Sequence, residues 1–208
     1  MQLFLILLSG ICWSIVYIEL VRKGIKDKTY GMPLFALGLN FAWEVIYSFS
    51  DAFEGVFPGQ RAVTIAWAVL DAFIIVTYFY YGKQHFPERA RKYFIPFSIL
   101  AFASCFVIQF AFFFHFTPVV AAKYSAFAQN AAMSVLFLTM LFQRGSARGQ
   151  SVLMAVCKWL GTLAPTILFG VIYAFDIYVI LLGIVCSVFD ILYIVMLAKW
   201  QEEPLVYA

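Results

Sequence analysis

The chain has 208 residues, of which 64% are hydrophobic and only 12% charged, and its mean hydropathy is +0.92. A soluble domain of this length does not need so much apolar surface, so the composition excludes that class and indicates one polytopic membrane domain over residues 1–208. The net charge of +3 agrees with the basic loops of a membrane protein and gives no sign of nucleic-acid binding.

The distribution of apolar residues predicts an all-α fold. A helix that crosses a membrane needs about 20 mostly apolar residues. Seven stretches meet this requirement, and they predict transmembrane helices over residues 2–21, 33–53, 61–81, 93–115, 118–142, 151–173 and 175–198.

Basic residues lie in alternate connections. They follow the first, third, fifth and seventh predicted helices, as in residues 22–28 and 83–92, whereas the other connections hold only Arg61. The positive-inside rule therefore predicts an N-terminus outside and a C-terminus in the cytoplasm. We expect an integral multi-pass protein of a bacterial plasma membrane or an endoplasmic reticulum, with the lipid bilayer as a partner.

Several polar side chains lie near the middle of these apolar stretches. Glu44, Asp71 and Asp190 occupy the second, third and seventh predicted helices, and Gln129 and Asn130 occupy the fifth. An acid at the bilayer centre costs roughly 2.5–3.5 kcal/mol on insertion scales, so such a residue is functional by default. Because lipid cannot solvate these groups, we expect them to face inward and form one polar chamber.

Helical spacing adds aromatic side chains to this chamber. Asn40, Trp43 and Glu44 stand at positions i, i+3 and i+4, so they share one face of the second helix. Each acid also has an aromatic neighbour on its own face. Tyr124 and Phe127 precede the two amides of the fifth helix. The residues predicted to line the pocket are Trp43, Tyr47, Tyr124, Phe127 and Tyr193.

An acid in a dry aromatic pocket suits cyclisation of a polyene. A buried carboxyl tends to keep its proton, because removal from water disfavours the charged form. Such an acid can protonate an epoxide oxygen or an alkene. Aromatic faces then stabilise the carbocation, by about 0.5–2 kcal/mol per contact, and dry walls exclude the water that would quench it.

Structural roles stay open for some of these residues. In one alternative interpretation, Asp71 pairs with Lys158 in a buried ion pair. In another, the amides of the fifth helix only form hydrogen bonds between helices. Glu44 and Asp190 are less easily explained by pairing, because the basic residues within apolar stretches are few and distant.

A set of short motifs runs through the second to seventh predicted helices: Asn40-Phe41-Ala42-Trp43-Glu44, Trp67 with Asp71, Gln129-Asn130 with Met133-Ser134, Lys158 with Gly161, and Asp190. With the length and helix layout, this set resembles the small integral-membrane terpene cyclases of fungal meroterpenoid and indole-diterpene pathways and their bacterial relatives. The resemblance implies a protonation-initiated cyclase that needs no metal or cofactor, with Glu44 and Asp190 as the catalytic acids and a hydrophobic prenylated substrate, epoxidised or not. In this interpretation the residues that position the acids or the substrate are Asn40, Asp71, Gln129 and Asn130.

The main alternative is a seven-helix transporter of a small solute. Residues 70–76 and 189–195 resemble each other, and each segment carries an aspartate at mid-depth, which suggests two three-helix halves. Pro165 is the one clear mid-helix proline, however, and no matching break is visible in the other half. Metal-dependent prenyl chemistry is not indicated, because the chain has no Asp-Asp pair to hold magnesium on a diphosphate. The oligomeric state is not indicated either.

Overall fold

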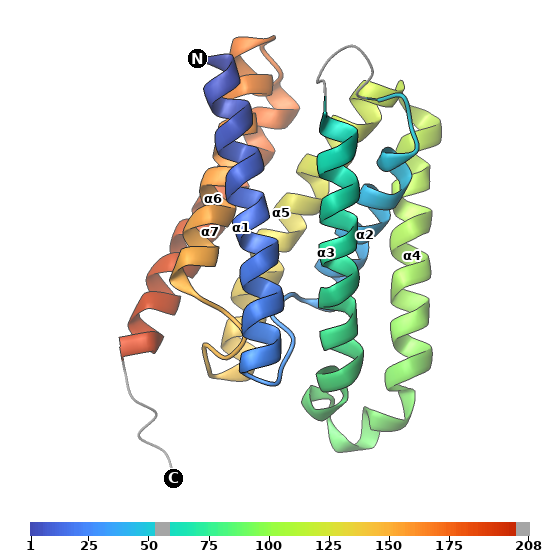
Figure 1. Cartoon of the computed structure of the whole chain (residues 1–208), viewed down its shortest axis with the longest axis vertical. Helices are drawn as coiled ribbons and strands as arrows, with labels where there is room; N and C mark the ends of the chain where they lie inside the picture. The colour runs from blue at the N-terminus through green and yellow to red at the C-terminus, as the bar shows by residue number, and fades with distance from the viewer. Residues whose placement is uncertain (53–58, 203–208) are drawn as a thin grey trace.

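The computed structural model describes residues 1–52 and 59–202, and its described part consists of helices and their connections, without strands. Figure 1 shows the helices side by side in one bundle. They are α1 (Gln2–Lys26), α2 (Leu34–Ser48), α3 (Gln60–Tyr81), α4 (Phe94–His115), α5 (Pro118–Arg144), α6 (Val152–Ile167) and α7 (Ile177–Glu202). The 3₁₀ turns η1 (Gly82–His85) and η2 (Glu88–Tyr93) join α3 to α4, and the π-helical segment η3 (Leu168–Ile172) continues α6. The predicted all-α fold with seven helices is confirmed.

Six helical spans are long and apolar enough to cross a membrane, with α6 and η3 counted together as Val152–Ile172, and α2 is shorter than predicted. Its 15 residues rise by about 22 Å, less than the ~30 Å of a bilayer's hydrocarbon core. The prediction for this helix ran to residue 53, which lies outside the described residues, but the helix ends at Ser48. Near this end the hydroxyls of Ser48 and Ser50 bond to the backbone carbonyls of Glu44 and Tyr47, an interaction that competes with helix continuation.

The connection from α1 to α2 enters the protein interior, so α2 begins inside the bundle. Thr29 and Met32 are each only 1% exposed. Irregular backbone is tolerated at membrane depth only where protein satisfies its polar groups. Here the Arg144 guanidinium donates to the Tyr30 carbonyl oxygen at 2.7 Å, and Arg148 donates to the Asp27 carbonyl oxygen at 2.7 Å. In Figure 1, α2 consequently occupies only the upper half of the bundle, beside α3 and α4.

The helices pack in two groups with α5 between them. α1 packs against α3 and α6, and α7 packs against α5 and α6. α2 packs against α3, α4 and α5. This arrangement lets side chains of α1, α2, α3, α5 and α6 line a cavity between the two groups of helices.

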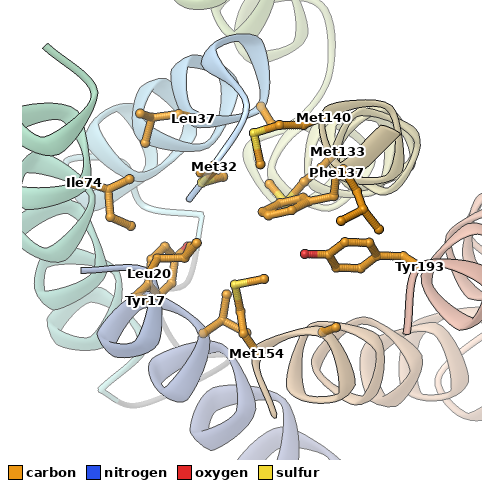
Figure 2. Close-up of a cluster of buried hydrophobic side chains, with 14 of the residues drawn as sticks. Tyr17, Leu20, Met32, Leu37, Ile74, Met133, Phe137, Met140, Met154 and Tyr193 are labelled. Atoms are coloured by element: carbon orange, nitrogen blue, oxygen red, sulfur yellow. The ribbon is translucent and has the colours of Figure 1, made fainter. Parts of the chain in front are cut away.

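A methionine-rich core closes the lower part of this space. The cluster includes residues of α1, α2, α3, α5, α6 and α7. Figure 2 shows its side chains directed toward one another, among them Leu20, Ile74, Met133, Met154 and Tyr193. Methionine is flexible and polarisable, so it fills the irregular gaps that differently tilted helices leave. Because this core fills the lower part of the bundle, the space for a cavity lies in the upper part.

Candidate active site

A cavity of about 340 Å³ lies among α1, α2, α3, α5 and α6. Its lining on α1 runs from Leu5 to Tyr17, a helical rise of about 18 Å. The lining is mostly apolar, and one cluster of its polar side chains, Tyr17, Asn40, Glu44 and Gln129, lies at the inner end. The volume lies within the range of about 300–1,000 Å³ that is usual for sites that bind small molecules.

Glu44 lies at this inner end and is 1% exposed. Its Oε1 accepts hydrogen bonds from the Tyr17 hydroxyl at 2.5 Å and from Asn40 Nδ2 at 2.9 Å. Asn40 Nδ2 also lies 2.9 Å from Asp71 Oδ2, so one amide group bridges the two carboxyls. The second oxygen of Glu44, Oε2, accepts no hydrogen bond from a neutral group in the part of the chain that the structure describes, and the Glu44 and Asp71 carboxyls are close enough to share a hydrogen bond through one proton.

A chain of side-chain amides orients Asn40. Gln109 Nε2 donates to Gln129 Oε1 at 2.6 Å and to the Leu39 carbonyl oxygen at 3.3 Å. Gln129 Nε2 in turn donates to Asn40 Oδ1 at 3.2 Å. The bonds all run in one direction, so Asn40 must turn its NH₂ group toward the carboxyls.

Neither Glu44 nor Asp71 forms an ion pair with any of the residues that the structure describes. The alternative interpretation in which Asp71 pairs with Lys158 is therefore wrong. Within the same residues, no group of three or more His, Cys, Asp or Glu side chains comes together as a metal site requires. The Glu44–Asp71 pair is thus held by neutral donors alone.

Asp190 lies elsewhere, in an ion pair with Lys158. Lys158 Nζ lies 2.6 Å from Asp190 Oδ1 and 2.7 Å from the Ser134 hydroxyl, and both charged side chains are 0% exposed. These contacts connect α5, α6 and α7, and Asp190 does not belong to the cavity lining. The predicted meeting of Glu44 with Asp190 is therefore wrong, because the buried lysine binds Asp190 and the carboxyl beside Glu44 is Asp71.

Three of the aromatic residues that the sequence placed in the pocket do not line it. Tyr47 packs against Trp43, with ring centroids 5.2 Å apart, and Tyr124 packs against Tyr178 at 4.4 Å. Tyr193 belongs to the methionine-rich core of Figure 2. The predicted residues that do line the cavity are Asn40, Trp43, Glu44, Phe127, Gln129 and Asn130.

The structure adds residues that the sequence analysis did not select. Tyr17 holds Glu44, and nothing in the sequence separates it from an ordinary tyrosine of a membrane helix. Gln109 did carry a signal, since it is an amide within an otherwise apolar, phenylalanine-rich helix. Trp13, Trp67 and Thr162 also line the cavity.

An ion pair lies near the outer end of the cavity. Lys123 lines the cavity, and its Nζ lies 2.6 Å from Asp176 Oδ2, just before α7 begins. Burial acts to raise the pKa of Asp176, but hydrogen bonds from the Lys123 ammonium and the Val179 backbone N–H hold this pKa below its usual range. Asp176 therefore keeps its negative charge and anchors α5 to the start of α7.

Residues 1–203 match the family model of the Pyr4-like transmembrane terpene cyclases. The chain is 29% identical to the terpene cyclase cdmG of Talaromyces verruculosus over 96% of this chain and 75% of that protein. It is 30% identical to the terpene cyclase pyr4 of Aspergillus fumigatus over 76% of this chain and 65% of that protein. A third relative is the terpene cyclase ascF of Acremonium egyptiacum, which is 40% identical over 90 residues. The match thus spans three quarters of cdmG and about two thirds of pyr4.

These relatives support the terpene cyclase interpretation and not the transporter. The six long apolar helices and the family together make this an integral multi-pass membrane protein, and the fungal relatives fit an endoplasmic reticulum location. The predicted resemblance is confirmed: the chain belongs to the Pyr4-like transmembrane terpene cyclases.

Proposed function

We propose that this chain starts the cyclisation of a polyprenyl chain, or of its terminal epoxide, by donating a proton from Glu44 without a metal ion. The observation that carries the proposal is a carboxyl at the inner end of an apolar cavity, beside the second carboxyl of Asp71 and without a cation partner among the described residues. The reaction belongs to terpenoid or meroterpenoid biosynthesis. An apolar substrate of this kind reaches the cavity from the lipid.

The hydrogen bonds assign the proton to one oxygen of Glu44. Oε1 already accepts from Tyr17 and Asn40, so the acidic hydrogen belongs on Oε2. An ionised carboxylate without a cation in such surroundings costs several kcal/mol, which favours the neutral acid at rest. Asp71, which shares the Asn40 amide, is a second acid that positions this group rather than a second donor.

The proton transfer can be followed atom by atom. The Oε2–H bond breaks, its electron pair stays on Glu44, and a new C–H bond forms on an alkene or a new O–H bond forms on an epoxide whose C–O bond opens. The resulting tertiary cation is captured by the next double bond of the chain. Tyr17 and Asn40 stabilise the carboxylate that forms, and the ring faces of Trp43 and Phe127 stabilise the moving cation.

Asp190 has a different proposed role. Its ion pair with Lys158 lies one helical turn from Thr162, which lines the cavity. We assign it to holding α5, α6 and α7 in the positions that shape the pocket, rather than to a second proton donor.

The direct test is incubation of membranes that contain the chain with linear and terminally epoxidised prenyl compounds, in D₂O with EDTA. We expect cyclic isomers by mass spectrometry. The alkene should carry one carbon-bound deuterium from initiation, whereas the epoxide takes deuterium onto an exchangeable oxygen. Membranes without the chain are the control. A product that appears only after magnesium is added, or solute uptake without any turnover of prenyl compounds, would contradict the proposal.

Tyr17→Phe tests the stabilisation of the Glu44 anion. A hydrogen bond to a charged group contributes about 1.5–3 kcal/mol, so loss of the hydroxyl should lower kcat roughly 10–100-fold. KM should change little, because the anion forms only as the proton leaves. Tyr178→Phe is the matched control, since that hydroxyl bonds to the Tyr124 carbonyl outside the cavity lining. Equal kcat values for the two variants would remove Tyr17 from the mechanism.

A further inference from the structure

Two side chains of the cavity lining carry oxygens without a hydrogen-bond partner. Asn130 Oδ1 on α5 and Thr162 Oγ1 on α6 are buried and unbonded among the residues the structure describes, and Thr162 is 2% exposed. An unsatisfied buried polar group costs about 1–3 kcal/mol, and the large majority of buried polar groups are bonded. Two such groups in the wall of one cavity indicate a ligand that bonds them.

The contacts between α5 and α6 place these two side chains on one side of the Lys158 ion pair. Ser134 lies one turn from Asn130 and donates to its carbonyl oxygen at 2.9 Å, and Lys158 lies one turn before Thr162. Lys158 Nζ and the Ser134 hydroxyl are 2.7 Å apart. Because α5 and α6 run in opposite directions, one turn back along α5 to Asn130 and one turn forward along α6 to Thr162 lead to the same side of the Lys158 ion pair.

Hydrogen bonds connect the acid to this part of the lining. Asn130 follows Gln129, and Gln129 bonds Asn40, which bonds Glu44. Glu44 is contributed by α2 and lies at the inner end of the same cavity. The three groups thus belong to the lining of one cavity.

We propose that Asn130 and Thr162 form a second hydrogen-bonding subsite that binds one oxygen atom during cyclisation, in the same cavity as Glu44. A carboxamide and a hydroxyl each offer both donors and an acceptor, so together they can bond the lone pairs and the hydrogen of an oxygen. A hydrocarbon satisfies neither group. The inference rests on the proposed function, because it assigns positioning residues to that reaction.

The oxygen has two possible sources with the same chemistry. It belongs to the reacting end of the substrate, where it becomes a hydroxyl as Glu44 protonates it, or to a water molecule that captures the last cation. In the first case, the subsite holds the oxygen while the C–O bond opens. In the second, it holds the water that forms the new C–O bond, and the water's proton returns to the Glu44 carboxylate.

The test compares Thr162→Val and Asn130→Leu, which remove hydrogen bonding at nearly constant volume, with Thr166→Val as the matched control. Thr166 lies one turn along α6, outside the lining, and bonds the Thr162 carbonyl. For each variant, kcat/KM is measured for epoxidised and for unmodified prenyl compounds, and products are formed in H₂¹⁸O. Melting temperatures in detergent identify variants that do not fold. If Asn130→Leu does not fold, the kinetics and labelling of Thr162→Val decide the test.

If the substrate supplies the oxygen, we expect kcat/KM for the epoxide to fall roughly 10–100-fold while that for the alkene stays within about twofold. If water supplies the oxygen, we expect kcat/KM for the epoxide and for the alkene to stay unchanged, and the fraction of ¹⁸O-labelled product to fall by a similar factor. Values of kcat/KM and of the ¹⁸O-labelled fraction that stay within twofold of those of Thr166→Val would overturn the proposed subsite. Absence of turnover by the unmodified chain would instead overturn the proposed function, and the subsite with it.

Discussion

Glu44→Gln is expected to lower kcat for cyclisation by roughly 10²–10⁴-fold, the usual contribution of a positioned general acid. The amide keeps the shape of the side chain and can accept the hydrogen bond from Tyr17, but it has no proton acidic enough for an alkene or an epoxide. Product formation from both compound classes is measured by mass spectrometry, under conditions where the unmodified chain is saturated.

Glu19→Gln is the matched control for this experiment. Glu19 lies on α1 at the other end of the bundle, where it pairs with Arg22 at 2.8 Å and lies outside the cavity lining. This variant should keep the kcat of the unmodified chain. Near-normal cyclisation by a folded Glu44→Gln protein would show that the proton comes from another group, and Asp71 would then be the next candidate.

Removal of one partner of the Lys158–Asp190 ion pair is expected to destabilise the bundle by about 3–5 kcal/mol. Both side chains are 0% exposed, so Asp190→Asn leaves a buried ammonium without an anion, and Lys158→Met leaves a buried carboxylate without a cation. Thermal melting in detergent should show large losses for each single variant. The double variant Lys158→Met/Asp190→Leu should recover most of the loss, because apolar groups replace both charges.

The same variants separate the two roles considered for Asp190. A double variant that melts normally and cyclises its substrate would limit Asp190 to a structural role. A double variant that melts normally and yields no product would support the catalytic role that the family resemblance implied. Equal melting temperatures for all four proteins would contradict the strength assigned to the buried pair.

The sequence by itself determined the all-helical membrane fold and singled out Glu44, the acid of the proposed mechanism. Apolar runs of about 20 residues leave few alternatives to a spanning helix, because lipid offers no partner for backbone N–H and C=O groups. The same reasoning identifies Glu44, since a carboxyl within such an apolar run is energetically costly and is therefore functional by default. It applies equally to Gln109, whose amide begins the chain that orients Asn40.

Only the tertiary structure decided which polar groups meet. Position along a helix gives the depth of a side chain, but not the rotation of the helix or the identity of its neighbours. Asp71 and Asp190 both lie near mid-depth, yet one shares an amide with Glu44 and the other binds Lys158. Tyr17 and Thr162 enter the cavity lining through packing between distant helices, and α2 ends at Ser48, where the Ser48 and Ser50 hydroxyls bond to backbone carbonyls.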